Sequence, residues 1–309
     1  MKWRKLGRIY APDGSTWWQK KYAFPPTPLL RSDTDGRDVL RLYCTFCDEN
    51  TVGRLGWVDV NPENPLEVLA VSKEPILADG QPGTFDENGL LPTRVMRVGD
   101  EIWCYYVGYQ LGHKVRYYQF AGLAISRDEG ETFERWRRTP VLERSDTELV
   151  NRTSTFVMQD EGVFKMWYVG GSEWVWIHGK YMPRYELKYI ESPDGKHFPD
   201  RGQTAISLEP GEYALGRPWI IEHDGRFKLI LSSRTEAKGY RLTYAESFDR
   251  GHTWVRKDGE IGIDVSAEGW DSTGIQYGSL FEYRGKLYLF YNGNNCGETG
   301  FGCALLESW

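Results

Sequence analysis

An internal repeat restricts the fold of this 309-residue chain more than any other feature. A short run rich in aromatic and aliphatic residues occurs five times, with equivalent positions at Phe46, Tyr106, Tyr168, Leu231 and Tyr291. The steps between these positions are 60, 62, 63 and 60 residues. Each copy lies among other short β-prone runs separated by Gly- and Asp-containing turns, which is typical of an antiparallel meander. A fixed period of this length, with about four strands per copy, predicts the blades of a β-propeller.

The repeat also predicts the domain organisation, because five copies fill the chain. We expect an all-β fold in which residues 1–309 form one five-bladed β-propeller domain with four antiparallel strands per blade. A single domain is favoured because a blade cannot bury its faces without neighbouring blades. Either end of the chain can supply the strand that closes the ring. The expected blades span residues 22–77, 84–142, 148–206, 212–263 and 270–308.

A turn motif recurs within this repeat. The pattern S-x-D-x-G-x-T-[FW] occurs at residues 126–133 and 247–254, and a form shorter by one residue occurs at 192–198. Its Asp and Gly are suited to a hairpin turn between the third and fourth strands. The pattern resembles the Asp-box of sialidases and related propellers, although sialidases have six blades rather than five. We interpret its aspartates as structural: Asp128, Asp194 and Asp249.

Composition excludes several classes of function. The net charge is −6 and no basic run exists, so the sequence predicts no nucleic-acid partner. No run approaches the ~20 apolar residues of a membrane span. No apolar stretch follows residues 1–5, so we expect no secretory signal. Five cysteines, an odd number, then favour a reducing cytoplasm. The sequence does not indicate an oligomeric state.

No cofactor is predicted from the sequence. The five histidines form no H-x-x-x-H pair, and Cys44 and Cys47, although spaced as C-x-x-C, are expected on opposite faces of a strand. We therefore predict no metal site. Carboxylate and amide oxygens gathered at one end of a propeller can bind Ca²⁺, so a calcium ion stays an alternative.

Candidate catalytic residues lie in the loops that lead into the first strand of each blade. These loops and the loops between second and third strands share one mouth of a propeller, where function concentrates. Two carboxylates can act on a glycosidic bond at ~5 Å or at roughly 6.5–9.5 Å from each other. Such residues also often satisfy backbone N–H groups of turns instead. The candidates are Asp86, Glu148, Glu212 and Asp271.

Candidate substrate-binding residues lie near the same mouth. A guanidinium matches a carboxylate or phosphate group, and a loop aromatic side chain can stack on a sugar ring. The alternative is that the arginines pair with the neighbouring carboxylates and that the aromatic side chains pack between blades. The predicted residues are Arg94, Arg152, Arg217, Arg234, Trp174, Trp270, Tyr277, Asn292 and Asn294.

The whole chain resembles the five-bladed propellers of the glycoside hydrolase families 32, 43 and 130, in particular a bacterial branch of that superfamily described only as glycosyl-hydrolase-like. The resemblance lies in residues 85–92, 122–126, 216–218, 269–272 and 291–302. It implies a catalytic Asp on the first blade, an Asp on the second and an acid Glu on the third.

The chain departs from this pattern in its first blade. Residues 22–26 carry no carboxylate, whereas Asp86 and Glu148 stand near the second and third positions. The leading hypothesis is a glycosidase-like enzyme that acts on a small glycoside or sugar derivative in the central channel through paired carboxylates. The alternatives are a non-catalytic sugar-binding propeller and a non-hydrolytic lyase, isomerase or transferase. The substrate and the stereochemistry stay open.

Overall fold

The computed structural model describes all 309 residues, and its regular structure consists almost entirely of β-strands, which confirms the predicted all-β class. The exceptions are a 3-10 turn at Asp258–Glu260 and the single short helix α1 (Asn294–Gly297). No helix is long and apolar enough to cross a membrane.

The strands pair as five groups of four antiparallel neighbours, which we call units 1 to 5. Unit 1 comprises β2 (Lys21–Ser32), β3 (Asp38–Cys47), β4 (Gly53–Asn61) and β5 (Asn64–Val71). Unit 2 comprises β6 (Leu90–Val98), β7 (Glu101–Leu111), β8 (Tyr117–Ser126) and β9 (Glu134–Arg135). Unit 3 comprises β10 (Asn151–Asp160), β11 (Val163–Ile177), β12 (Lys180–Ser192) and β13 (Gln203–Ile206). Unit 4 comprises β14 (Glu212–His223), β15 (Arg226–Thr235), β16 (Arg241–Ser247) and β17 (Val255–Arg256). Unit 5 comprises β18 (Gln276–Tyr283), β19 (Lys286–Asn292), β20 (Phe301–Ser308) and the N-terminal strand β1 (Lys2–Tyr10).

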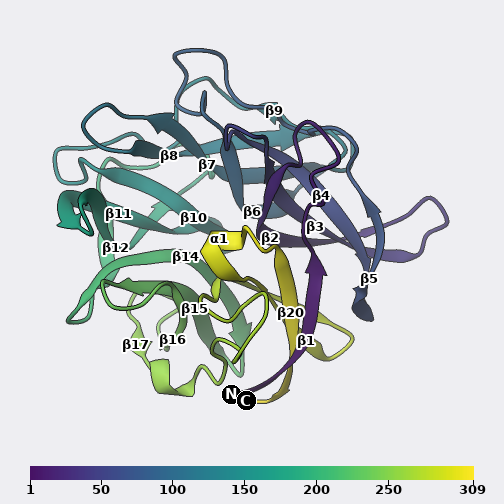
Figure 1. The fold of residues 1–309 in the computed structure, drawn as a ribbon. Coiled ribbons are helices and arrows are strands. Elements are labelled where there is room, and N and C mark those ends of the chain that lie inside the picture. Colours follow the sequence, from purple (N-terminus) through teal and green to yellow (C-terminus); the bar gives the residue numbers. More distant parts are fainter.

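The first strands of the units face a common centre. β2 contacts β6, β6 contacts β10, β10 contacts β14, β14 contacts β18, and β18 contacts β2 again. Figure 1 shows the units arranged around this centre, with α1 near its middle. Short parallel pairings of β8 with β10 and of β12 with β14 join units 2, 3 and 4 into one continuous sheet. The inner strands therefore surround a common centre, and residues of different units can contact one another there.

The N-terminus completes the last unit. Strand β1 pairs antiparallel with β20, so both chain ends lie in unit 5 (Figure 1). The sequence left open which end supplies this strand. The pairing ties the first residues of the chain to the last, and it covers the outer edge of β20, which would otherwise present unpaired backbone groups.

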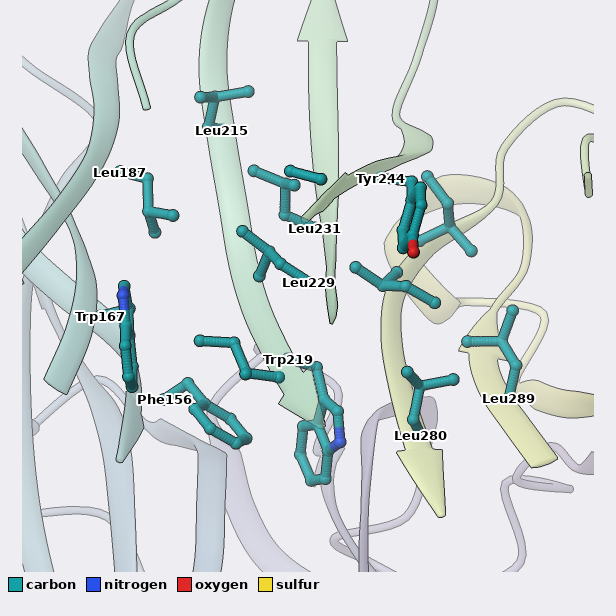
Figure 2. Close-up of a cluster of buried hydrophobic side chains, with 14 of the residues drawn as sticks. Phe156, Trp167, Leu187, Leu215, Trp219, Leu229, Leu231, Tyr244, Leu280 and Leu289 are labelled. Carbon is teal, nitrogen blue, oxygen red and sulfur yellow. The ribbon is translucent and has the colours of Figure 1, made fainter. Parts of the chain in front are cut away.

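Large aromatic side chains fill the space between units. Figure 2 shows Phe156 and Trp167 of unit 3 beside Trp219 and Leu229 of unit 4. The rings of Phe156 and Trp219 meet edge to face at 5.4 Å between centroids. Burial of each such side chain contributes about 1.5–3 kcal/mol. Second strands such as β3 and β7 are buried along most of their length, so side chains on both faces of a unit stabilise it against its neighbours.

The recurrent turn motif is held by its own side chains. Ser126 Oγ donates to Asp128 Oδ1 at 2.7 Å, and the same carboxylate accepts from Thr132. Ser247 and Asp249 repeat this arrangement in unit 4. These aspartates bond within their turns, in agreement with the structural interpretation.

The inner strands carry backbone irregularities at matching places. The register of β10, β14 and β18 with their neighbours shifts around Ser154, Arg217 and Tyr277, whose φ angles are 49°, 46° and 57°. A left-handed conformation costs a non-glycine residue about 1–2 kcal/mol. Such bulges re-aim side chains, and strain retained at one place in a fold points to function there.

Candidate functional site

Of the four predicted catalytic carboxylates, those of Asp86, Glu148 and Asp271 belong to buried residues and that of Glu212 to a partly buried one, and each bonds to groups of its own unit. Asp86 has an exposed fraction of 0%, and its Oδ2 accepts from Arg135 Nε at 2.7 Å and from Tyr106 Oη at 3.0 Å. Asp271 Oδ2 accepts from Lys5 Nζ at 2.7 Å and from Tyr291 Oη at 3.1 Å. Both carboxylates thereby tie a lead-in loop to the second and the outermost strand of the same unit.

Glu148 and Glu212 have the same kind of partners. Glu148 Oε2 lies 2.6 Å from Arg152 Nε and accepts from Tyr168 Oη at 2.9 Å. Glu212 accepts two hydrogen bonds from Arg256, at 2.7 and 2.9 Å, and one from Ser233. Burial opposes the ionisation of Glu212, but these hydrogen bonds outweigh it and hold its pKa below the ordinary value.

We call these four groups the carboxylate sites. Each carboxylate precedes its hydroxyl partner by 20 or 21 residues, as in Asp86 with Tyr106 and Glu212 with Ser233. No side-chain partner is shared between any two of the four sites. The structure thus connects each predicted acid or base to cations and hydroxyls of its own unit, whereas paired catalysis requires two carboxylates at one bond.

A polar cavity of about 380 Å³ borders one carboxylate site. It is lined by no hydrophobic residue, and its lining includes Glu148, Lys188 and Thr204. Lys188 Nζ donates to Glu186 and to Thr204, so the cavity wall is already paired. A cavity without an apolar or aromatic wall lacks the surface on which a sugar ring stacks.

A second group of side chains crosses between units and is rich in tyrosine. We call it the tyrosine cluster. Tyr185 and Tyr240 share a hydrogen bond between their hydroxyls at 2.9 Å, and the rings of Tyr240 and Tyr277 lie 5.5 Å apart. The rings of Tyr109 and Tyr117 meet edge to face at 5.7 Å. The cluster draws on units 2 to 5, and its members are Tyr109, Tyr117, Tyr185, Tyr213, Tyr240 and Tyr277.

Helix α1 connects this cluster with the centre of the ring. Burial raises the pKa of its Cys296, and a hydrogen bond with Tyr277 and the charges of Arg234 and Arg116 offset part of this rise. Cys296 also contributes to the raised pKa of Tyr22 in unit 1. Since α1 lies near the middle of the ring in Figure 1, the cluster lies there too.

The phenols of the cluster are hydrogen-bond donors at neutral pH. Burial raises the pKa of Tyr185, Tyr240 and Tyr277, and the neighbouring phenols raise those of Tyr185 and Tyr277 further. Each side chain therefore offers an apolar ring face and a protonated hydroxyl. This combination suits a ligand with both C–H faces and hydroxyl groups.

Polar groups without a protein partner lie beside the cluster. The side-chain Oδ1 and Nδ2 atoms of Asn151 and the hydroxyl of Thr153 are buried and make no hydrogen bond. Asn151 lies next to Tyr185, because a Cβ atom on Gly171 would lie 3.0 Å from both Asn151 Oδ1 and Tyr185 Cβ. Buried polar groups normally form hydrogen bonds, because a buried donor or acceptor without a hydrogen bond costs about 1–3 kcal/mol. The first residues of β10 thus carry buried polar groups whose hydrogen bonds the fold does not complete.

Arg234 and Tyr277 are the predicted binding residues that belong to this region. The guanidinium of Arg234 lies 5.5 Å from the ring centroid of Tyr213 and 5.1 Å from that of Tyr240. It forms no ion pair with a carboxylate. Trp174, on the long hairpin of unit 3, contacts Tyr118 edge to face at 6.4 Å.

The other predicted arginines are engaged within the fold. Arg152 pairs with Glu148, as described above. Arg217 donates to backbone oxygens of β18 and β2 and to Thr27 Oγ1. Arg94 Nε donates to Val157 O at 3.1 Å, and its guanidinium lies over Phe156.

Three further predicted binding residues hold loops of unit 5. Trp270 stacks on Tyr291 at 5.1 Å, and Asn292 Nδ2 donates to backbone oxygens at 2.8 and 3.0 Å. Asn294 Oδ1 accepts from the backbone N–H groups of Thr273 and Gly274. All five cysteines are free, and no three His, Cys, Asp or Glu side chains converge to hold a metal ion.

Sequence reasoning missed most of the tyrosine cluster. Tyr213 and Tyr277 begin inner strands, and Tyr117 and Tyr240 stand in or beside loops between second and third strands, so the predicted mouth did contain them. The signal in the sequence was the repeated occurrence of tyrosine at the starts of inner strands and in the loops between second and third strands.

Comparison with known proteins places the chain among relatives. No protein-family model matches it. The "Uncharacterized protein Rv1502" of Mycobacterium tuberculosis (strain ATCC 25618 / H37Rv) is 34% identical over 309 residues, which are 100% of both chains. The "Uncharacterized protein MT1551" of the strain CDC 1551 / Oshkosh matches over the same length at 34% identity. The chain belongs to the Rv1502 family.

Solved structures with a similar fold include proteins described as glycoside hydrolases. One described as a glycoside hydrolase has a TM-score of 0.71 at 18% identity and covers 97% of this chain and 90% of its own. A putative glycosidase from Bacteroides thetaiotaomicron has a TM-score of 0.70 at 16% identity, over 99% and 97% of the two chains. A thermostable family-43 glycoside hydrolase has a TM-score of 0.68 at 15% identity, over 94% and 90%. These likenesses show a glycoside-hydrolase-like β-propeller fold for the Rv1502 family, as the resemblance implied.

Proposed function

We propose that the protein binds a small carbohydrate or sugar derivative at the tyrosine cluster. The observation that carries this proposal is a contrast between two groups of side chains. The tyrosine cluster has protonated phenols and the unpaired Asn151 amide, whereas the carboxylates of the carboxylate sites already have cation and hydroxyl partners.

In the same proposal, units 1 to 5 are the blades of one five-bladed propeller domain, and the recurrent turns are Asp-boxes. The five free cysteines support a reducing, cytoplasmic location.

The chemistry of the cluster suits a sugar. Ring faces of tyrosine pack against the C–H face of a pyranose or furanose, while phenol and amide groups exchange hydrogen bonds with its hydroxyls. The residues come from several units, so a ligand would bridge blades held rigidly by the scaffold. Rigid presentation lowers the conformational entropy lost on binding.

The sequence-based alternative of a binding propeller is therefore favoured over hydrolysis by paired carboxylates. A general acid must reach the leaving oxygen and a nucleophile must reach the sugar carbon. Asp86 and Asp271 are held instead by a cation and a tyrosine of their own units. We assign Asp86, Glu148, Glu212 and Asp271 the role of fixing lead-in loops.

The test compares binding and turnover in the same proteins. Saturation-transfer NMR with a panel of monosaccharides and p-nitrophenyl glycosides is expected to show binding to the wild-type protein. We expect Tyr277→Ala to weaken this binding, while folded Asp86→Asn retains it. Release of p-nitrophenol that disappears in folded Asp86→Asn would support hydrolysis instead, and mass spectrometry of the products would reveal a reaction without added water. Absence of binding to every member of the panel and to the corresponding anionic sugars would refute the proposal.

A further inference from the structure

We propose that the ligand of the tyrosine cluster carries an anionic carboxylate or phosphate group, which Arg234 binds directly and Arg116 assists. This inference rests on the proposed function, because it names the chemical class of the carbohydrate bound at the same place. Its basis is a set of guanidinium groups that meet at the centre of the ring without carboxylate partners.

The environment of Arg234 is the first observation. Arginines that pack against the units usually pair with a carboxylate, as Arg41 does with Asp59 at 2.8 Å and Arg256 with Glu212 at 2.7 Å. Arg234 is half-buried, yet it forms no ion pair, and its guanidinium lies near the rings of Tyr213 and Tyr240. A guanidinium that stacks on rings through its face keeps its N–H edges free for a planar or tetrahedral anion.

Arg116 supplies a second charge from a different unit. It lies between β7 and β8 of unit 2, 5.6 Å from the ring centroid of Tyr117, and it forms no ion pair. The charges of Arg116 and Arg234 both act on Tyr117 and on Cys296. Against the rise caused by burial, two guanidiniums from different units thus lower the pKa of the same phenol and the same thiol.

The deeper part of the ring adds to the positive potential. Arg94 and Arg217 are enclosed by the inner strands, and neither has a carboxylate partner. Arg217 Nε makes no hydrogen bond at all. The carboxylates of Glu236 and Glu298, which help to raise the pKa of Tyr213 and Tyr22 respectively, belong to exposed residues. Charges buried in a low-dielectric interior are screened less than exposed ones. The buried carboxylates of Asp86, Glu148 and Asp271 are each paired with a cation of their own unit, so Arg94 and Arg217 add positive potential that no ion pair offsets.

A neutral sugar alone would not use this arrangement. Hydroxyl groups accept single hydrogen bonds, whereas a carboxylate or phosphate accepts the parallel pair that a guanidinium edge donates. Charge-assisted hydrogen bonds are about twice as strong as neutral ones. The anionic group would lie against Arg234, with the sugar ring on the tyrosine faces.

The experiment uses matched sugars and matched variants of the full-length protein. Affinities for glucose, galactose and mannose are compared with those for their uronates and 1-phosphates by isothermal titration calorimetry. The variants are Arg234→Ala, Arg234→Lys and Arg116→Ala, and the control is Arg226→Ala. Arg226 is the first residue of β15 and Arg234 is the last but one, so they lie at opposite ends of this strand, and Arg226 pairs with Glu246 at 3.5 Å. Arg116 is exposed, so its replacement leaves the fold intact.

We expect the anionic member of at least one sugar set to bind roughly tenfold to a hundredfold more tightly than its neutral form. Arg234→Ala is expected to abolish this preference and Arg116→Ala to reduce it. Arg234→Lys would restore part of it, and Arg226→Ala would leave it unchanged. Binding of the uronate alone or the 1-phosphate alone identifies which anion is recognised.

Two results would overturn the inference, and they differ in what they say about the proposed function. Neutral and anionic sugars that bind equally well, with no effect of Arg234→Ala, would refute the anion while leaving carbohydrate binding in place. A panel in which no sugar binds, neutral or anionic, would refute both.

Discussion

The carboxylate sites and the tyrosine cluster are built from corresponding parts of the repeat but are completed in different ways. In a carboxylate site, such as that of Asp86 with Arg135 and Tyr106, a charge meets its counter-charge within one unit. In the tyrosine cluster, contacts such as Tyr185 to Tyr240 cross between units, and the polar groups of Asn151 stay free. Complete local pairing stabilises the scaffold, whereas incomplete contacts between units leave capacity for a ligand.

The largest expected effect is loss of stability at a carboxylate site. Asp86→Ala leaves Arg135 without its counter-charge and Tyr106 without its acceptor, and removing one partner of a buried pair costs about 3–5 kcal/mol. Because the side chain of Arg135 is partly exposed, we expect a value near the lower limit. Urea-induced unfolding measures it. A loss below about 0.5 kcal/mol, as is usual for surface substitutions, would break the distinction between the two regions.

The acid dependence of stability sharpens the same comparison. The lowered pKa of Glu212 means that its ionised form stabilises the fold above about pH 4.3, the ordinary pKa of a glutamate. That contribution is lost as the pH falls from there through the lowered pKa of the folded state. Unfolding midpoints of the wild-type protein should therefore decline more steeply below pH 4.5 than those of Glu212→Gln. Parallel pH profiles would show that the ion pair with Arg256 does not stabilise the fold.

Substitution within the tyrosine cluster should change binding more than stability. Tyr240→Phe keeps the ring but removes the hydroxyl that meets Tyr185 at 2.9 Å. We expect a stability loss of about 1 kcal/mol and a roughly tenfold weaker affinity for the tightest sugar of the panel. Calorimetric titration at matched folded fractions measures the affinity. As a control, Tyr168→Phe, at the carboxylate site of Glu148, should lower stability and leave affinity unchanged.

The smallest effect is expected for an aromatic side chain outside both regions. Trp176 is 64% exposed and contacts Tyr181 of the same hairpin. Its replacement by Ala should change the free energy of unfolding by less than about 0.5 kcal/mol, as surface substitutions do, and should not change sugar affinity. A marked loss of affinity would extend the binding region onto the hairpin of unit 3.

The repeat made the all-β class predictable from sequence because each copy carries its own strand and turn signals. It also located the loops that lead into the inner strands. The roles of Asp86 and Asp271 were not predictable in the same way, because their cations, Arg135 and Lys5, lie 49 and 266 residues away. Only the recurrent offset between each carboxylate and its hydroxyl partner was present in the sequence.

The tyrosine cluster was harder to foresee for a related reason. Its contacts join residues from different copies of the repeat, such as Tyr185 and Tyr240, which are 55 positions apart. Their directions depend on bulges such as the one at Tyr277, where φ is 57°, and periodicity does not encode a bulge. Sequence patterns describe one copy well and say little about how copies meet at the centre.

The most direct test of the account measures sugar affinity in folded Asp86→Asn and in Tyr277→Ala, side by side, for the tightest ligand of the panel. The account predicts wild-type affinity in Asp86→Asn and a loss of at least roughly tenfold in Tyr277→Ala. Retained affinity in Tyr277→Ala together with lost affinity in a folded Asp86→Asn would contradict it and would return the site to the carboxylates.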